Sequence, residues 1–136
     1  MKRYFWLLSI LLAIIAFMVL FNGCGRVELA SNTPVILNYS YNQTHFSKEA
    51  KKEEKEKIIS ILNDKKYHSS IFVGELSCGF SEDVSIKVDN EIYEIACDNC
   101  PYIKVKSTEK YLFLTDEEAK NMREIFFNYG GFFPCE

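Results

Sequence analysis

The chain has 136 residues, enough for one domain once an N-terminal targeting segment is set apart. Nearly half of the residues are hydrophobic and 15% are aromatic, a composition that excludes an intrinsically disordered chain. The formal net charge is −3, and the loss of Lys2 and Arg3 with the first segment makes the remainder more acidic. We therefore expect no nucleic-acid partner.

The first segment of the chain has the layout of an export signal. Two basic residues come first, and an almost uninterrupted apolar run from Tyr4 to Phe21 follows. Because positive charge stays on the cytoplasmic side, we expect the chain from Gly25 onward to lie outside the cell membrane. As a helix the run would span roughly 27 Å, close to the ~30 Å hydrocarbon core, so an uncleaved helical anchor also fits.

The apolar run ends in Phe21-Asn22-Gly23-Cys24. This ending resembles the lipobox of small bacterial exported lipoproteins: Gly23 matches the pattern, whereas Phe21 and Asn22 replace its aliphatic and small residues. The resemblance implies that the Cys24 thiol receives a diacylglyceryl group and that cleavage precedes Cys24. Lipid chains would then hold the protein at the membrane. An uncleaved anchor and plain secretion are the alternatives.

Two elements are expected after the anchor. Residues 25–34 are small, polar and non-periodic, which is typical of a tether, and residues 35–41 alternate as a possible first strand. Ser47 is expected to cap a helix from Lys48 to about Asn63. Only its second half is apolar enough for burial, because acids and bases alternate through the first half and fit a solvated face.

Strand-like alternation then replaces the helical period. A strand is expected at Ile71–Leu76, followed by two strands, at 84–88 and 91–95, that flank the turn pair Asp89-Asn90. In that hairpin Ile86 would face Tyr93, and Val84 would face Ile95.

A second hairpin is expected directly before the last helix. Ile103 and Val105 would pair with Leu114 and Leu112 if residues 107–110 form a four-residue loop. Such a loop would keep all four apolar side chains on one face.

Thr115 and Glu118 form a capping box, and the helix that follows ends at Gly130-Gly131. Its buried side would carry Ala119, Met122, Ile125, Phe126 and Tyr129. The aromatic tail is expected to be core, with Phe127 exposed.

Together these elements predict a two-layer α+β fold. An antiparallel meander of four to five strands would carry an N-terminal and a C-terminal helix on one face, preceded by an N-terminal hydrophobic helix. The expected divisions are a signal peptide or membrane anchor (1–24), a tether with a possible first strand (25–46) and a small outer domain (47–136).

Four cysteines remain outside when Cys24 belongs to the anchor, and an even number in an exported domain favours disulfides. The candidates are Cys78, Cys97, Cys100 and Cys135. Cys97 and Cys100 are close enough to bridge each other, which would leave Cys78 for Cys135, while the other two pairings stay open. A bridge between Cys78 and Cys135 would contribute roughly 4 kcal/mol in the chain-entropy model.

Cys97-Asp98-Asn99-Cys100 could instead be a redox motif. A thioredoxin-type motif opens a helix, whereas Pro101-Tyr102 here leads into an expected strand. Zinc is a further alternative, but the chain has one CxxC rather than two, and an oxidising compartment disfavours thiolates. We therefore expect no metal and no cofactor.

No recognised catalytic motif occurs, and His45 and His68, the two histidines, have no evident partner. This pattern favours a non-enzymatic binding or accessory lipoprotein at the cell membrane, with a possible protein partner outside the cell. No binding residue is indicated. The alternatives are an extracytoplasmic thiol oxidoreductase that uses Cys97 and Cys100, a hydrolase with an unrecognised site, and a membrane-anchored inhibitor or immunity-type protein.

Overall fold

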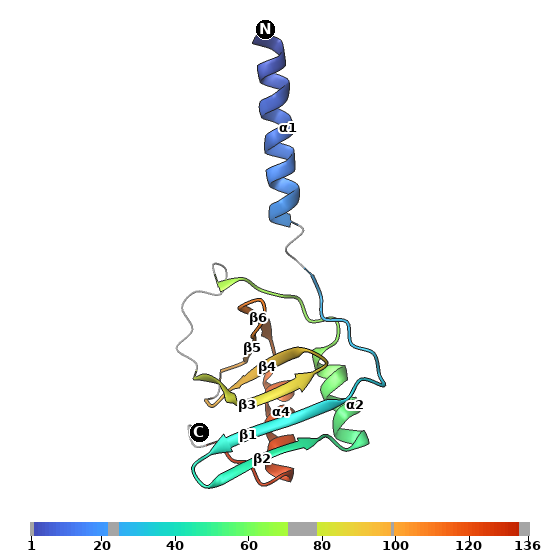
Figure 1. Cartoon of the computed structure of the whole chain (residues 1–136), viewed down its shortest axis with the longest axis vertical. Coiled ribbons are helices and arrows are strands. Elements are labelled where there is room, and N and C mark those ends of the chain that lie inside the picture. The colour runs from blue at the N-terminus through green and yellow to red at the C-terminus, as the bar shows by residue number, and fades with distance from the viewer. Residues whose placement is uncertain (1, 22–24, 71–78, 99, 134–136) are drawn as a thin grey trace.

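A computed structural model describes residues 2–21, 25–70, 79–98 and 100–133 (Figure 1). It confirms the α+β class, with one antiparallel sheet in the order β2-β1-β3-β4-β5-β6. The sheet has six strands rather than four to five. The elements are α1 (Lys2–Phe21), β1 (Val35–Tyr41), β2 (Thr44–Glu49), α2 (Lys52–Leu62), β3 (Phe80–Val88), β4 (Glu91–Ala96), β5 (Tyr102–Val105), β6 (Lys110–Phe113) and α4 (Asp116–Asn128).

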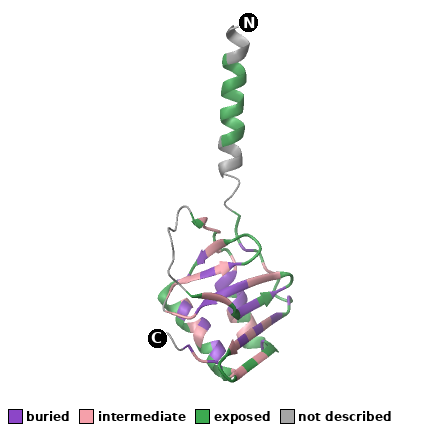
Figure 2. Ribbon diagram, turned by 60° about the vertical axis from the view of Figure 1, so that its left-hand side comes forward, coloured by how far each residue is buried: buried purple, intermediate pink, exposed green. Residues whose placement is uncertain are grey.

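Helices α2 and α4 pack on one face of the sheet, as the sequence predicts. Figure 1 shows α2 and α4 behind the strands, and Figure 2 shows the buried residues between the two layers. Alternate strand residues and one stripe of each helix form a single apolar core. Its fully buried members include Leu37, Ile58, Ile86, Leu112 and Phe126.

The β3–β4 hairpin is confirmed around its turn. Asp89 takes a left-handed φ of 53°, and Ile86 pairs with Tyr93. The register shifts between Phe80 and Ser85, so the direct pairing expected between Val84 and Ile95 is not part of the observed ladder. Val84 instead pairs with Tyr39 of β1.

Strand β2 corrects the expected helix from Lys48 to Asn63. Ser47 and Lys48 lie in β2, which forms a two-residue hairpin with β1, and α2 begins at Lys52. Lys51 is the N-cap and makes no side-chain capping bond, so Ser47 does not cap this helix. The positive φ of 52° at Asn42 turns the chain, and pairing with β1 outweighs the helix propensity of the charged residues.

The β5–β6 hairpin forms, but two residues away from the expected register. Ile103 pairs with Leu112, and Val105 pairs with Lys110. The loop is residues 106–109, where Glu109 has a φ of 54° and its carboxylate lies 2.9 Å from Lys104 Nζ. A shift of two residues keeps every side chain on its face, so the apolar pattern alone does not distinguish the two registers.

The capping box of α4 is confirmed. Thr115 Oγ1 accepts from the Glu118 N–H at 3.2 Å, and Glu118 Oε2 accepts from the Thr115 N–H at 2.8 Å. The helix buries Ala119, Met122, Ile125 and Phe126, as expected. Gly130 follows it with a φ of 87°, a conformation that glycine adopts without a steric cost.

Residues 25–34 are more tightly attached to the domain than a tether would be. Val27 is 2% exposed in the core, and its N–H donates to the Lys65 carbonyl at 3.0 Å. Asn63 Oδ1 accepts from the Leu29 N–H at 2.7 Å. The folded unit therefore includes the segment that precedes β1.

Helix α1 precedes this unit, and its described side chains, from Trp6 to Ala16, are exposed. No helix within the described ranges is both long and apolar enough to cross a membrane. The expected strand at Ile71–Leu76 lies outside the described residues, as do Asn22, Gly23 and Cys24.

Candidate binding surface on the outer face of the sheet

The sheet face opposite α2 and α4, here called the outer face, gathers aromatic side chains near β6. Tyr102 pairs with Phe113, and their ring centroids are 5.5 Å apart. Tyr111 lies 5.6 Å from Phe80 and 6.4 Å from Tyr102. Phe113 is 48% exposed at the border of this cluster. The arrangement places aromatic surface where a partner can reach it.

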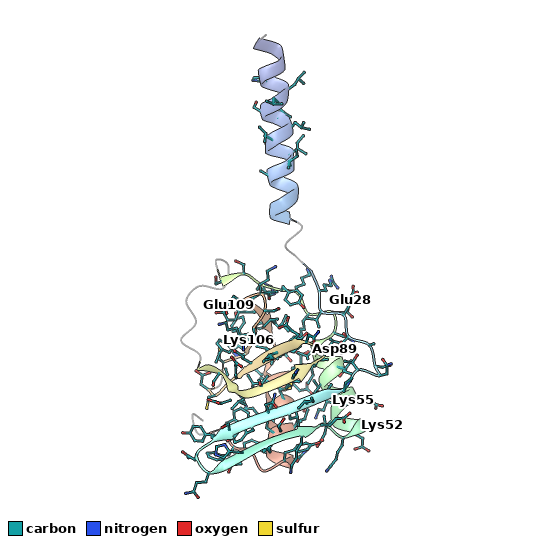
Figure 3. The ribbon with its side chains drawn as sticks, in the orientation of Figure 1. Glu28, Lys52, Lys55, Asp89, Lys106 and Glu109 are labelled. Atoms are coloured by element: carbon teal, nitrogen blue, oxygen red, sulfur yellow. The ribbon has the colours of Figure 1, made fainter. Side chains whose placement is uncertain are left out.

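A charged row crosses the same face beside the aromatic cluster. Glu94 of β4 pairs with Ser85 on one side and with Lys104 on the other. Lys104 in turn forms an ion pair with Glu109, and Lys106 contacts Glu82. Figure 3 shows Lys106 and Glu109 in the part of the domain nearest α1.

Glu94 is the one acidic residue that is buried among the described residues, with 7% of its surface exposed. Burial raises its pKa, the nearby Lys104 opposes that increase, and the carboxylates of Glu82 and Glu109 add to it. The pKa of Lys104 is also raised, chiefly by its hydrogen bond to Glu109. A buried carboxylate among charges is typical of binding and catalytic sites.

This geometry supports recognition better than catalysis. The outer-face residues named above include no histidine, the Ser85 hydroxyl donates to the Glu82 carbonyl at 2.8 Å, and Glu109 and Glu82 are held by lysines rather than by one another. Groups of three or more potential metal ligands are absent from the described part of the chain. The lysines and carboxylates can make directional hydrogen bonds and ion pairs with a partner, and the aromatic cluster can bury apolar surface against it.

The cysteine candidates are only partly placed. Cys97 is half-buried, and its N–H donates to the Gly79 carbonyl at 3.2 Å. Cys100 donates its N–H to Asp98 Oδ1 at 3.1 Å. Cys78 and Cys135 lie outside the described residues, so the connectivity stays a prediction. The chain after Cys100 enters strand β5 at Tyr102, as expected, rather than a helix that would activate a thiol.

The two histidines lie apart in the fold. His45 is on β2, where its Nδ1 is 2.8 Å from Ser40 Oγ. His68 forms an isolated backbone bridge with Tyr111, with both N–H···O distances at 2.8 Å. The structure therefore does not combine them into one site.

The aromatic tail belongs to the core, as expected. Phe126 and Phe133 are buried and in contact, and Phe127 is 44% exposed, as predicted. Tyr129 is half-buried, and its hydroxyl donates to Glu54 at 2.5 Å. This bond joins the end of α4 to the first turn of α2.

The surface also has a depression of about 460 Å³ between residues 27–30 and the end of α2. Asn63 lies in its wall, and its amide both accepts from the Leu29 N–H and donates to the Leu29 carbonyl. The hydrogen bonds of the Asn63 side-chain amide therefore attach the N-terminal segment to the domain. The depression is better explained by packing than by ligand binding.

Sequence reasoning did not identify the outer face as a site. Alternation along β4 directs Glu94 away from the core, where a glutamate is usually solvated. Its burial depends on neighbours from β3 and β5, which only the three-strand register brings together. The opposite charges of Glu94 and Lys104 were the available signal, but they are informative only when the strand pairing is known.

No protein-family model, curated protein or solved structure matches this chain. Its function is therefore argued from the residues of the outer face and of the N-terminal segment.

Proposed function

We propose that the chain is a non-enzymatic accessory protein, held outside the cell membrane by a lipid on Cys24, that binds a partner protein through its outer face. The positive pair and the apolar run of the first segment support export. An acidic domain whose recognised surface is neither a metal centre nor a catalytic constellation supports binding.

The observation that carries the binding proposal is the combination of residues on the outer face. Protein interfaces are enriched in aromatic residues at their centre and are polar at the rim. Phe113, Tyr102 and Tyr111 form such a centre, and the Lys104–Glu109 pair borders it. The helical layer covers only the inner face, so this surface stays accessible within the described residues.

A photo-reactive phenylalanine analogue tests which face binds. It is placed at Phe113 or at Phe127, which are 48% and 44% exposed but lie on the sheet and on α4 respectively. After irradiation of whole cells that express the full chain, we expect a discrete covalent adduct from position 113 and none from position 127. Equal labelling, or no adduct from position 113, would contradict the proposal.

A charge reversal makes this test specific. Lys104→Glu places a second carboxylate beside Glu94 and removes the ion pair with Glu109. We expect the adduct at position 113 to fall by at least about tenfold, since reversal of a charge that faces the partner costs about 1.4 kcal/mol or more of binding free energy. The matched control is Lys120→Glu on α4, which should leave the adduct unchanged.

The anchor has its own test. Intact-mass analysis of the protein from membranes should give a chain that begins at Cys24 and carries a diacylglyceryl group. A chain that retains Met1 would show an uncleaved segment and overturn the lipid anchor. Replacement of Cys24 by Ala should release the domain from the lipid-modified fraction.

A further inference from the structure

We propose that β2 pairs with β2 of a second copy of this chain, so that two sheets join at this edge into one continuous antiparallel sheet. The sheet order places β2 at one border, bonded on one side to β1. Figure 1 shows it at the border farthest from α1. At the other border, β6 is bridged by His68, so the two edges are not equivalent.

The direction of the β2 backbone groups follows from its pairing with β1. In an antiparallel pair, alternate residues direct their N–H and C=O groups toward the neighbouring strand. Phe46, Lys48 and Ala50 are every second residue, so their backbone groups point the same way. Ala50 donates its N–H to the Val35 carbonyl of β1 at 2.8 Å. The backbone groups of His45, Ser47 and Glu49 therefore point away from the sheet.

The edge is accessible, and the charged side chains of Lys48 and Glu49 are its features of the kind that usually discourage pairing. His45, Ser47 and Glu49 are exposed, and β2 contains no proline and no bulge in its register with β1. Its length of six residues is sufficient for a ladder with another strand. An open edge of this kind is a template for strand addition.

Charge complementarity supports a second copy as the occupant, in a register centred on Ser47. With Ser47 opposite Ser47 of the partner copy, His45 faces Glu49 across the junction in both directions. Phe46 then neighbours Lys48, repeating a contact in which Lys48 Nζ lies 6.0 Å from the Phe46 ring of its own chain. Moving the register by one pair in one direction places Lys48 against Lys48, which is unfavourable.

One tautomer of His45 has a donor for this contact. Its Nδ1 is 2.8 Å from Ser40 Oγ, and when that hydroxyl donates to Nδ1 the proton is on Nε2. Nε2–H can then donate to the Glu49 carboxylate of the second copy. Glu49 makes no salt bridge within the described residues, so this carboxylate can accept the bond.

Cross-linking tests the register directly. A hydrogen-bonded antiparallel pair has Cα atoms about 5.5 Å apart, within the range that a disulfide spans. The full chain with Ser47→Cys, in mild detergent and under oxidising conditions, should form a covalent dimer. Ser60→Cys on the exposed face of α2 is the matched control and should form much less. Equal yields from the two variants would overturn the proposal.

A proline substitution can prevent pairing between two copies without unfolding the domain. The Ser47 N–H points away from β1, so Ser47→Pro removes an inter-chain donor and keeps the β1–β2 ladder. We expect detergent-corrected mass measurement to give a dimer for the native chain and for Ser47→Ala, and a monomer for Ser47→Pro. Circular dichroism checks that the proline variant stays folded.

Two further outcomes complete the test. Glu49→Gln should raise the dissociation constant about two- to fivefold, the effect of losing an exposed charged contact. A native chain that is monomeric over the measured concentrations, or a folded proline variant that dimerises like the native chain, would refute the pairing.

Discussion

The same strands form both faces of the sheet, but the side chains on the two faces have different roles. On the inner face, side chains such as Leu37, Ile86 and Leu112 have no exposed surface and share one core with α2 and α4. On the outer face, aromatic rings and ion pairs stay partly exposed, and the buried acid Glu94 lies among other charges. Stability should therefore reside on the inner face and recognition on the outer face.

The largest expected effect separates two adjacent residues of β6. Leu112→Ala removes a fully buried side chain and should lower the free energy of unfolding by about 2–5 kcal/mol. Phe113→Ala, on the other face of the same strand, should cost roughly 1 kcal/mol or less, because that ring is 48% exposed. Chemical denaturation of the full chain in detergent measures both. Equal losses would remove the distinction between the faces.

The second effect tests how the C-terminal tail closes the inner face. The Tyr39 hydroxyl donates to the Phe132 carbonyl and accepts from the Phe132 N–H at 3.0 Å. Tyr39→Phe leaves both backbone groups without this partner and should cost about 1–3 kcal/mol.

Tyr41→Phe is the control for that change. Tyr41 packs edge-on against Phe132 with centroids 5.2 Å apart, but its hydroxyl forms no hydrogen bond within the described residues. Denaturation midpoints should therefore be almost unchanged for Tyr41→Phe. A loss as large as that of Tyr39→Phe would assign the effect to ring packing instead.

The sequence predicts the inner face better than the outer one, for a physical reason. Burial of one strand side produces an alternating burial pattern in β1, the turn pair Asp89-Asn90 marks the β3–β4 hairpin, and the capping box marks α4. Strand β2 was missed because THFSKE contains one apolar residue and its state depends on pairing with β1. The β5–β6 register was missed because a shift of two preserves both faces.

The outer face could not be assembled from local patterns. Glu94, Lys104 and Phe80 come from three strands, and the register shift between Phe80 and Ser85 determines which of them meet. No spacing within one segment contains that information. These residues can be recognised as one site only when the strand order and register of the sheet are known.

The third effect concerns the helical layer that covers the inner face. Thr115→Ala removes the acceptor for the Glu118 N–H and should lower the free energy of unfolding by about 1 kcal/mol. Thr115→Ser retains the hydroxyl and should cost only a few tenths of that amount. If both variants lose the same free energy in thermal or chemical denaturation, the cap is not the source of stability.

The smallest effect returns to the outer face and has a defined pH dependence. Burial, opposed by Lys104, raises the folded pKa of Glu94 above its ordinary value of 4.5. The folded state therefore holds this proton more tightly than the unfolded state. The stabilisation is fully present below the unfolded pKa and is lost as the pH rises through the folded pKa.

Glu94→Gln replaces the titrating carboxyl with a neutral group, so it should become more stable relative to the native chain as the pH rises from acid to neutral. Denaturation of both chains over that range measures the difference. A Glu94→Gln difference that falls with pH would mean that the charged carboxylate is favoured by Lys104 rather than penalised by burial. In that case Glu94 would act as a structural ion partner within the outer face, and the interfacial role would rest on Lys104, Tyr102 and Phe113.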